Sequence, residues 1–226
     1  MLLEADGQTP YYPSSPSATG SPLAADCSIP LNASGGAATS ITIPHLAGAR
    51  IWFSIGTPLT FTLNPGPALV EPSVTNPSDP NINQQWDFTE LTYNDAQLFA
   101  NISMVDFVCI PVALNLTDSS GNQQTVQGLP AGGLDTACAG LTAQANADGQ
   151  DWNSLSVTSK GQNLRAQPNQ RHRDELVPVL GLLRQLRQPG LADVHVGDAQ
   201  RSHPGILWNG YRAGDRRGAD MSASAW

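Results

Sequence analysis

Residues 86–93 read WDFTELTY, an apolar and aromatic run that is typical of a β-strand. Glu90 lies inside this run, where a charged side chain costs desolvation free energy unless it faces solvent or a cleft. A second run, MVDFV at residues 104–108, holds Asp106 in a similar setting. Taken singly, each acid is explained as the solvent-facing residue of an alternating strand. Taken together, two carboxylates on neighbouring strands meet the needs of glycoside hydrolysis, which uses a proton donor and a second carboxylate.

Short runs of this kind recur along the chain, separated by Pro, Gly, Asn and Asp. They predict strands at 39–44, 50–55, 59–64, 86–93, 98–103 and 105–115, and a hairpin over 116–127. Apolar residues at helical spacing predict one helix, about 134–147, that ends near Gly149. Many strands and one helix favour a mainly β fold, a sandwich or barrel with one helical insertion.

Charge is distributed unevenly along the chain. Residues 1–165 hold three basic and thirteen acidic residues, near −10, whereas residues 166–226 hold eight basic and six acidic residues, near +2. A strongly negative body repels phosphate backbones, so we expect no nucleic-acid partner. No stretch is long and apolar enough to span a bilayer, so we expect no membrane partner.

The residues that bind metals or act as nucleophiles form no recognisable motif. Cys27, Cys109 and Cys138 match no zinc spacing, and they leave open one disulfide with a spare thiol. Three of the four histidines lie after residue 165, and no phosphate-binding loop or serine-hydrolase elbow is present. We therefore expect neither a metal nor a cofactor.

Three Asn-X-Ser/Thr triplets favour a secreted protein; they begin at Asn32, Asn101 and Asn115. The first four residues, Met-Leu-Leu-Glu, begin no signal peptide, because a basic start and an apolar run are both missing. An extracellular location is what the family resemblance described below implies, although these first residues begin no signal peptide.

Several motifs resemble fungal members of glycoside hydrolase family 64, which are β-1,3-glucanases with a thaumatin-like domain. The similar segments are RIWFS (50–54), LNPGPALVEPS (63–73), NPSDPN (76–81), ELTYN (90–94), VDF (105–107), GLP (128–130) and LDT (134–136). The resemblance covers roughly residues 2–165, and the long Asn/Pro motif is its most specific part. It implies a thaumatin-like or osmotin-like fold for a partial domain at residues 1–165.

The resemblance also implies an activity and its residues. In the family, the acid is a Glu in the strand motif and the base is an Asp sixteen positions later, a spacing that Glu90 and Asp106 keep. It implies inverting, endo-type cleavage of β-1,3-glucan by a monomer, with Glu90 as general acid and Asp106 as general base. The alternatives are a non-catalytic thaumatin-like module that binds β-glucan or the cell wall, and an inactive fragment.

Other side chains near these motifs are candidates for substrate binding. Stacking on sugar rings is expected of Trp52 and Trp86, although a strand Trp is also a common core residue. Hydrogen bonds to glucose hydroxyls are expected of Asn81, Asn83 and Tyr93, with turn or strand-surface roles as the alternative. Glu71 is a third carboxylate near the motif and is expected to line the cleft.

After Arg165 the texture of the sequence changes: Arg becomes frequent and strand patterns vanish. A one-nucleotide shift in a back-translation of residues 167–199 permits family-like strings such as SSRYWDSY and VNYVNQVW. We therefore predict that residues 166–226 are an off-frame tail, disordered or irregularly helical; the alternative is a natural basic linker. Residues 2–7 look like the end of a strand whose beginning is missing, so we expect a domain truncated at both ends.

Overall fold

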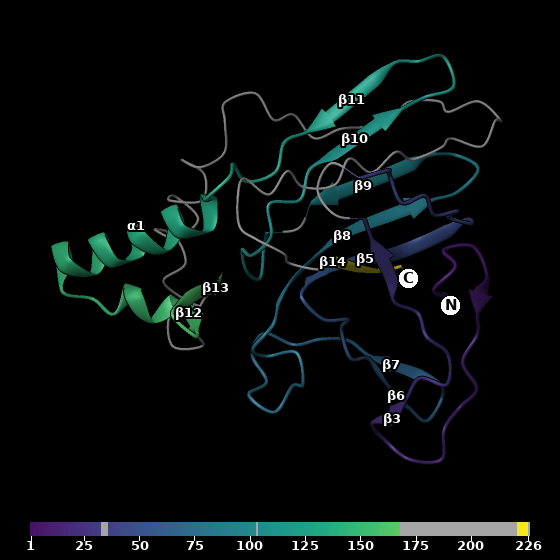
Figure 1. The fold of residues 1–226 in the computed structure, drawn as a ribbon, viewed down its shortest axis with the longest axis horizontal. Coiled ribbons are helices and arrows are strands. Elements are labelled where there is room, and N and C mark those ends of the chain that lie inside the picture. Colours follow the sequence, from purple (N-terminus) through teal and green to yellow (C-terminus); the bar gives the residue numbers. More distant parts are fainter. Residues whose placement is uncertain (33–35, 103, 168–220, 226) are drawn as a thin grey trace.

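The computed structural model describes residues 1–32, 36–102, 104–167 and 221–225, and its centre is an antiparallel sheet of five strands (Figure 1). In spatial order these strands are β4 (Ile29–Leu31), β14 (Met221–Ala225), β5 (Leu46–Ile55), β8 (Gln85–Tyr93) and β9 (Leu98–Ile102). Within the described residues the edges of this sheet are β4 and β9, so it is open and forms no closed barrel.

Smaller sheets and two helical elements complete the described fold. A three-stranded sheet contains β3 (Ser21–Pro22), β6 (Thr62–Asn64) and β7 (Ala68–Val70). Three ribbons pair β1 (Leu2–Leu3) with β2 (Pro10–Tyr11), β10 (Leu114–Thr117) with β11 (Gln123–Val126), and β12 (Ser156–Ser159) with β13 (Gln162–Ala166). The helical elements are α1 (Gly133–Asp148) and the short 3₁₀ helix η1 (Trp152–Leu155). The prediction of a mainly β fold with one α-helical insertion is confirmed, and so is the hairpin, as β10 and β11.

Helix α1 begins and ends within one residue of the predicted bounds. Gly149 ends it in the left-handed region, with φ of 72°, and its N–H donates to the Ala145 carbonyl at 2.9 Å. Cys138 and Leu141 of α1 pack against Trp152 and Leu155 of η1 and against the end of β13. None of the described helices is long and apolar enough to cross a bilayer.

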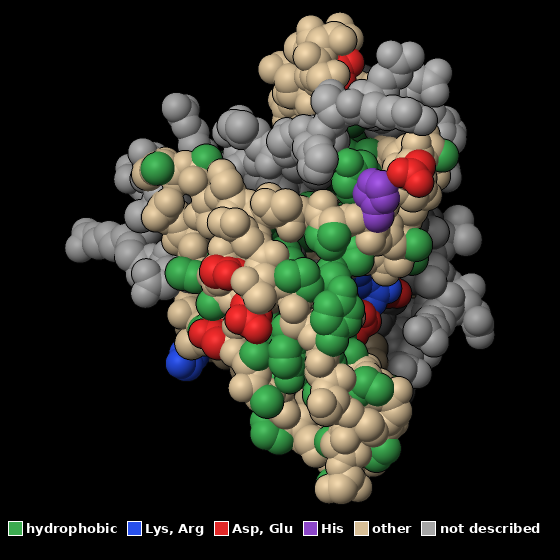
Figure 2. Space-filling model, turned by 90° about the vertical axis from the view of Figure 1, so that its right-hand side faces the viewer, with side chains coloured by type: hydrophobic (Ala, Val, Ile, Leu, Met, Phe, Trp, Pro, Cys, Tyr) green, Lys and Arg blue, Asp and Glu red, His purple; other side chains and the backbone are tan. Residues whose placement is uncertain are grey.

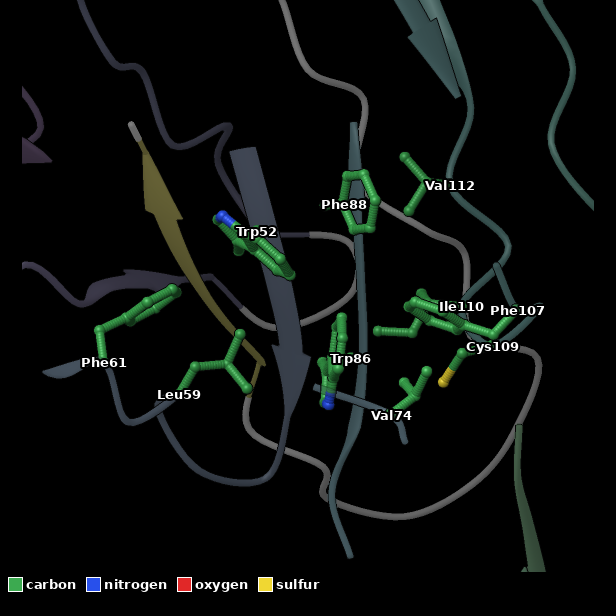
Figure 3. Close-up of a cluster of buried hydrophobic side chains, with 10 residues drawn as sticks. All are labelled: Trp52, Leu59, Phe61, Val74, Trp86, Phe88, Phe107, Cys109, Ile110 and Val112. Atoms are coloured by element: carbon green, nitrogen blue, oxygen red, sulfur yellow. The ribbon is translucent and has the colours of Figure 1, made fainter. Parts of the chain in front are cut away.

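The pairing of β5 with β8 builds the main core. Successive side chains of a strand alternate between its faces, so Trp52 and its cross-strand partner Phe88 share a face, as do Arg50 and Glu90. On that face a cluster of buried side chains fills the space beneath the sheet (Figure 3). Its members are Trp52, Leu59, Phe61, Val74, Trp86, Phe88, Phe107, Cys109, Ile110 and Val112.

Two predicted strands are absent from the structure. Residues 39–44 form no strand; their alternating apolar residues, Ile41 and Ile43, pack from an extended loop onto the cluster that contains Leu91. Residues 105–115 are irregular until β10 begins, and their one ladder contact is an isolated bridge from Val108 to Ala166. In both places the apolar spacing reflects burial, which a packed loop satisfies as well as a strand does.

The structure describes only part of the tail that the sequence predicts to be off-frame. The prediction that residues 166–226 are disordered or irregularly helical is wrong for Met221–Ala225, whose backbone forms a strand between β4 and β5 in the central sheet. The proposed change of reading frame falls mainly on residues 168–220, which lie outside the described residues. The three cysteines are buried and none forms a disulfide.

Candidate active site

A cavity of about 250 Å³ opens on the face of the sheet that carries Arg50 and Trp52. Three structural elements form its walls: the β5–β8 pair, the loop after β7, and the segment after β9. The lining residues are Arg50, Trp52, Glu71, Pro72, Ser73, Val74, Thr75, Trp86, Phe88, Asp106 and Phe107. The sheet contributes three aromatic side chains and Arg50, and the two loops contribute Glu71 and Asp106 among polar and apolar residues. Hydrophobic side chains run down the middle of one face of the molecule, with acidic side chains on either side (Figure 2).

Arg50 joins two carboxylates at this cavity. Its Nε donates to Glu90 Oε1 at 3.1 Å, and its Nη2 lies 3.1 Å from the same oxygen. Its Nη1 donates to Glu71 Oε2. The guanidinium carbon also lies 4.7 Å from the centre of the Phe88 ring, within cation–π range. With both carboxylates ionised, the trio Arg50, Glu71 and Glu90 has a formal charge of −1, so one added proton makes it neutral.

The Asn/Pro motif after β7 shapes the wall that carries Glu71. Buried Asp79 accepts the N–H of Ser73 at 2.8 Å and that of Asn81 at 2.7 Å, which ties the two ends of the loop together. Ser73 Oγ accepts the N–H of Asn76 at 3.1 Å. Side-chain acceptors of this kind replace ladder hydrogen bonds in turns. The motif is thus a scaffold that presents its first residues to the cavity.

Asp106 lies in an exposed bend between β9 and the buried residues that follow. The expectation that Asp106 lies on a strand is wrong, whereas Glu90 does lie on β8. Phe107 packs against the rings of Trp86 and Phe88, which anchors the chain directly after Asp106 (Figure 3). Asp106 and Glu71 line the cavity, and Glu90 is linked to it through Arg50.

Trp52 and Trp86 are core residues. Each is 2% exposed, and their rings pack on one another with centroids 5.3 Å apart. They contact the cavity from below, with little of either ring exposed, because the loops around β5 and β8 cover the face that they share. Their core role is therefore clear, and stacking on a sugar stays a prediction.

The three polar residues predicted to bind sugar hydroxyls lie outside the cavity lining. Asn81 is 1% exposed, and its amide accepts the N–H of Thr60 at 2.8 Å and donates to the Thr60 carbonyl at 2.9 Å, so its role is structural and that prediction is wrong. Asn83 is exposed on the turn before β8, and half-buried Tyr93 packs edge-on against His45. For these two, sugar binding stays a prediction.

Sequence reasoning missed Arg50, Ser73 and Thr75 as cavity residues. A signal for Arg50 existed: it is the one basic residue in the first 159, inside an apolar strand, where an unpaired charge is costly. Such a residue calls for acidic partners on the next strand. Within the described parts of the chain, no three His, Cys, Asp or Glu side chains come together as a metal site.

Comparison with known proteins adds a family and relatives. The family model described as "Beta-1,3-glucanase", for glycoside hydrolase family 64, matches residues 1–176. A glucan endo-1,3-beta-glucosidase of Cellulosimicrobium cellulans is 31% identical over 128 residues, 56% of this chain and 22% of that protein. An enzyme of the same description from an Arthrobacter strain is 37% identical over 82 residues, 36% of this chain and 15% of that protein.

Among solved structures, the chain resembles a laminaripentaose-producing β-1,3-glucanase determined in complex with laminaritetraose. The TM-score is 0.61 and the sequence identity 32%, over 73% of this chain and 43% of that one. The chain therefore spans 22% and 15% of the two curated relatives and 43% of the solved enzyme.

Proposed function

The chain belongs to glycoside hydrolase family 64, and from this premise we propose that it hydrolyses β-1,3-glucan with inversion, using Glu90 as general acid and Asp106 as general base. Inverting hydrolysis needs a protonated acid at the leaving oxygen and an ionised carboxylate that activates water on the opposite face of the sugar. The two named relatives are described as glucan endo-1,3-beta-glucosidases, which supports the choice of substrate.

The observation that carries the proposal is the cavity, which Glu71 and Asp106 line from separate loops and to which Arg50 links Glu90. Exposed Asp106 is open to water, as a base that activates water must be. Glu90 is held by Arg50 with its side chain still 36% exposed, so it is oriented and yet reachable. Arg50 thus fixes where the carboxyl group of Glu90 lies, beside a cavity that Glu71 and Asp106 line from two other elements.

The test measures hydrolysis and stereochemistry together. Laminarin hydrolysis is followed by reducing ends for the chain as written, a frame-corrected version, Glu90→Gln and Asp106→Asn, with the surface variant Asp118→Asn as control. We expect both site variants to lose at least about 100-fold in kcat, the control to keep full activity, and the first product to be the α-anomer by NMR. Wild-type hydrolysis by Glu90→Gln, or a β-anomer, contradicts the proposal.

The rival function is a non-catalytic module that binds β-glucan or the cell wall. It predicts laminarin binding with no release of reducing ends from either version of the chain. A Glu90 locked in a buried ion pair would favour this rival; its 36% exposed side chain favours catalysis instead. Affinity electrophoresis in laminarin gels, beside the hydrolysis assay, separates the two functions.

Finer expectations belong to the same proposal. We propose a secreted, monomeric protein with the family's thaumatin-like arrangement and a fungal affiliation, on the strength of the motifs at residues 63–81. The relatives named above are bacterial, so a broader comparison of family members is the test of the fungal affiliation.

A further inference from the structure

Asp87 is a buried acid that the proposed mechanism does not use. It lies on β8 between Trp86 and Phe88 and is 3% exposed. Among the described residues, no Lys, Arg or His lies within ion-pair distance of its carboxylate. Burying a carboxylate without a cationic partner lowers the free energy of unfolding, so other interactions of the carboxylate must offset that cost.

The contacts of Asp87 show what the carboxylate holds. Oδ1 accepts the N–H of Phe88 at 2.9 Å on its own strand. Oδ2 accepts the N–H of Ile110 at 3.1 Å, from the segment that follows Asp106. The carboxylate thus bridges β8 and that segment, and asparagine has a single acceptor oxygen with which to do so.

The segment at residues 107–110 is held on two sides. On its far side, Val108 and Ala166 exchange backbone hydrogen bonds of 2.8 and 2.9 Å, and the Cys109 thiol donates to the Leu164 carbonyl at 2.8 Å. These contacts fix the segment to β13. On the side of β8, Phe107 packs on Trp86 and Phe88, and Asp87 adds a hydrogen bond to the segment's backbone at Ile110. β8 is the strand that carries Glu90, three residues after Asp87.

We propose that Asp87 is a positioning residue: by holding the Ile110 amide, it sets where Asp106 lies relative to Glu90. The inference rests on the proposed function for its catalytic part, since Asp87 itself touches no substrate. An acid and a base that act on opposite faces of one sugar must keep their separation, because misplacement by about 1 Å can cost about 100-fold in rate.

The environment of Asp87 makes its hydrogen bond to the Ile110 amide depend on pH; this hydrogen bond is called the tie below. Burial raises its pKa to about 7, while the hydrogen bonds from the backbone amides of Phe88, Ile110 and Cys109 act in the opposite direction. The titratable groups around it are Cys109 on the facing segment and Arg165 of β13 beside Cys109; its neighbour across β5 is Phe53. Protonation turns one acceptor oxygen into a donor, so the tie weakens as pH falls through neutrality.

The first test is amide hydrogen exchange in the full chain. Asp87→Asn is compared with the wild type and with the control Asp118→Asn. In the wild type, the Asp118 carboxylate lies at the surface and accepts the N–H groups of Ser120 and Asn122. We expect Asp87→Asn to speed exchange at Ile110 by at least about 10-fold and to leave β5 and the other β8 amides protected, with no such change in the control. Unchanged exchange at Ile110 overturns the inference.

A second measurement guards against a variant that does not fold. In the wild type, protection of Ile110, corrected for intrinsic base catalysis, should show an inflection near pH 7; a profile without one overturns the inference. Kinetics then test positioning: Asp87→Asn should lower kcat on laminarin about 10-fold, change KM less than 2-fold, and remove an ionisation near neutral pH. If Glu90→Gln and Asp106→Asn abolish hydrolysis while Asp87→Asn alters neither exchange nor kcat, this inference fails alone. If those two variants stay active, the proposed function fails.

Discussion

Arg50 and Glu90 face each other across the β5–β8 pair, and both the Nε and the Nη2 of Arg50 lie 3.1 Å from a single carboxylate oxygen, Oε1. Contacts to one oxygen fix the direction of the carboxyl group more than a single bond would. The register of β5 and β8 therefore sets where the Glu90 carboxylate lies, because it places Arg50 directly opposite Glu90.

The first prediction concerns this pair. Arg50→Lys keeps the charge but replaces the planar fork with a point charge, so it cannot hold Glu90 and Glu71 together. We expect kcat on laminarin to fall about 10- to 100-fold, with a smaller change in KM. Exposed Lys160→Arg is the control for exchanging one cationic side chain for the other at the surface. Wild-type kcat in Arg50→Lys would show that the pair has no part in catalysis.

A second prediction concerns Glu71. In Glu71→Gln, the carboxylate that accepts from Arg50 Nη1 is replaced by a neutral amide, so the guanidinium is held less firmly beside Glu90. We expect kcat on laminarin to fall by about 10-fold because Glu90 is then less well positioned. The measurement is steady-state hydrolysis of laminarin by the variant and the wild type. Wild-type kcat in Glu71→Gln would show that Glu71 has no part in placing Arg50 and Glu90.

Stability should depend on pH through Asp87. Its pKa in the folded protein, about 7, is above the value of 3.8 for an unburied Asp. Below pH 4 both states are protonated; between pH 4 and 7 the folded state binds the proton that the unfolded chain releases. The free energy of unfolding contributed by Asp87 therefore falls as pH rises from about 4 to about 7, by at most roughly 4 kcal/mol in all.

Urea unfolding at pH 5 and pH 8 measures this effect. The difference in unfolding free energy between wild type and Asp87→Asn isolates Asp87 from the other acids. We expect the wild type to be favoured over the variant more at pH 5 than at pH 8. A difference that does not change with pH contradicts the prediction.

The core role of Trp86 gives a fourth prediction. Trp86→Ala removes a ring packed against Trp52 and Phe107 and should lower the free energy of unfolding by about 3–5 kcal/mol. Exposed Asn83→Ala should change it by less than about 0.5 kcal/mol. Thermal or urea unfolding makes the comparison. Equal stability of Trp86→Ala and wild type would restore a surface role for this Trp.

Patterns of residue type along the sequence predicted the elements whose formation depends mainly on neighbouring residues, such as α1 and β8. Helix α1 was predictable because its apolar spacing ends at a glycine that can adopt positive φ. Strand β8 was predictable because six of its nine residues are aromatic, aliphatic or β-branched, the types that favour strands. Both follow from a stretch of chain and its immediate neighbours.

The parts of the site that failed depend on distant contacts. Asp106 lies in a bend because Val108 pairs with Ala166 and Phe107 packs on Trp86, and no local pattern contains those partners. Trp52 is buried rather than open because loops far along the chain cover its face. The spacing of acids along the sequence identifies candidate catalytic residues. The residues that position those acids, such as Arg50 and Phe107, come close to them only through strand register and loop packing.

The bond from Cys109 to Leu164, with the Val108–Ala166 bridge beside it, has a consequence for synthesis on the ribosome. The two bonded residues are 55 positions apart, so at the usual 5–20 residues per second the chain waits roughly 3 to 11 s for the second partner. During that interval Phe107, Cys109 and Ile110 are without β13, and their apolar side chains are open to chaperones or to other nascent chains. Slow codons between residues 109 and 166 would lengthen this exposure, and the yield of folded protein should fall with them.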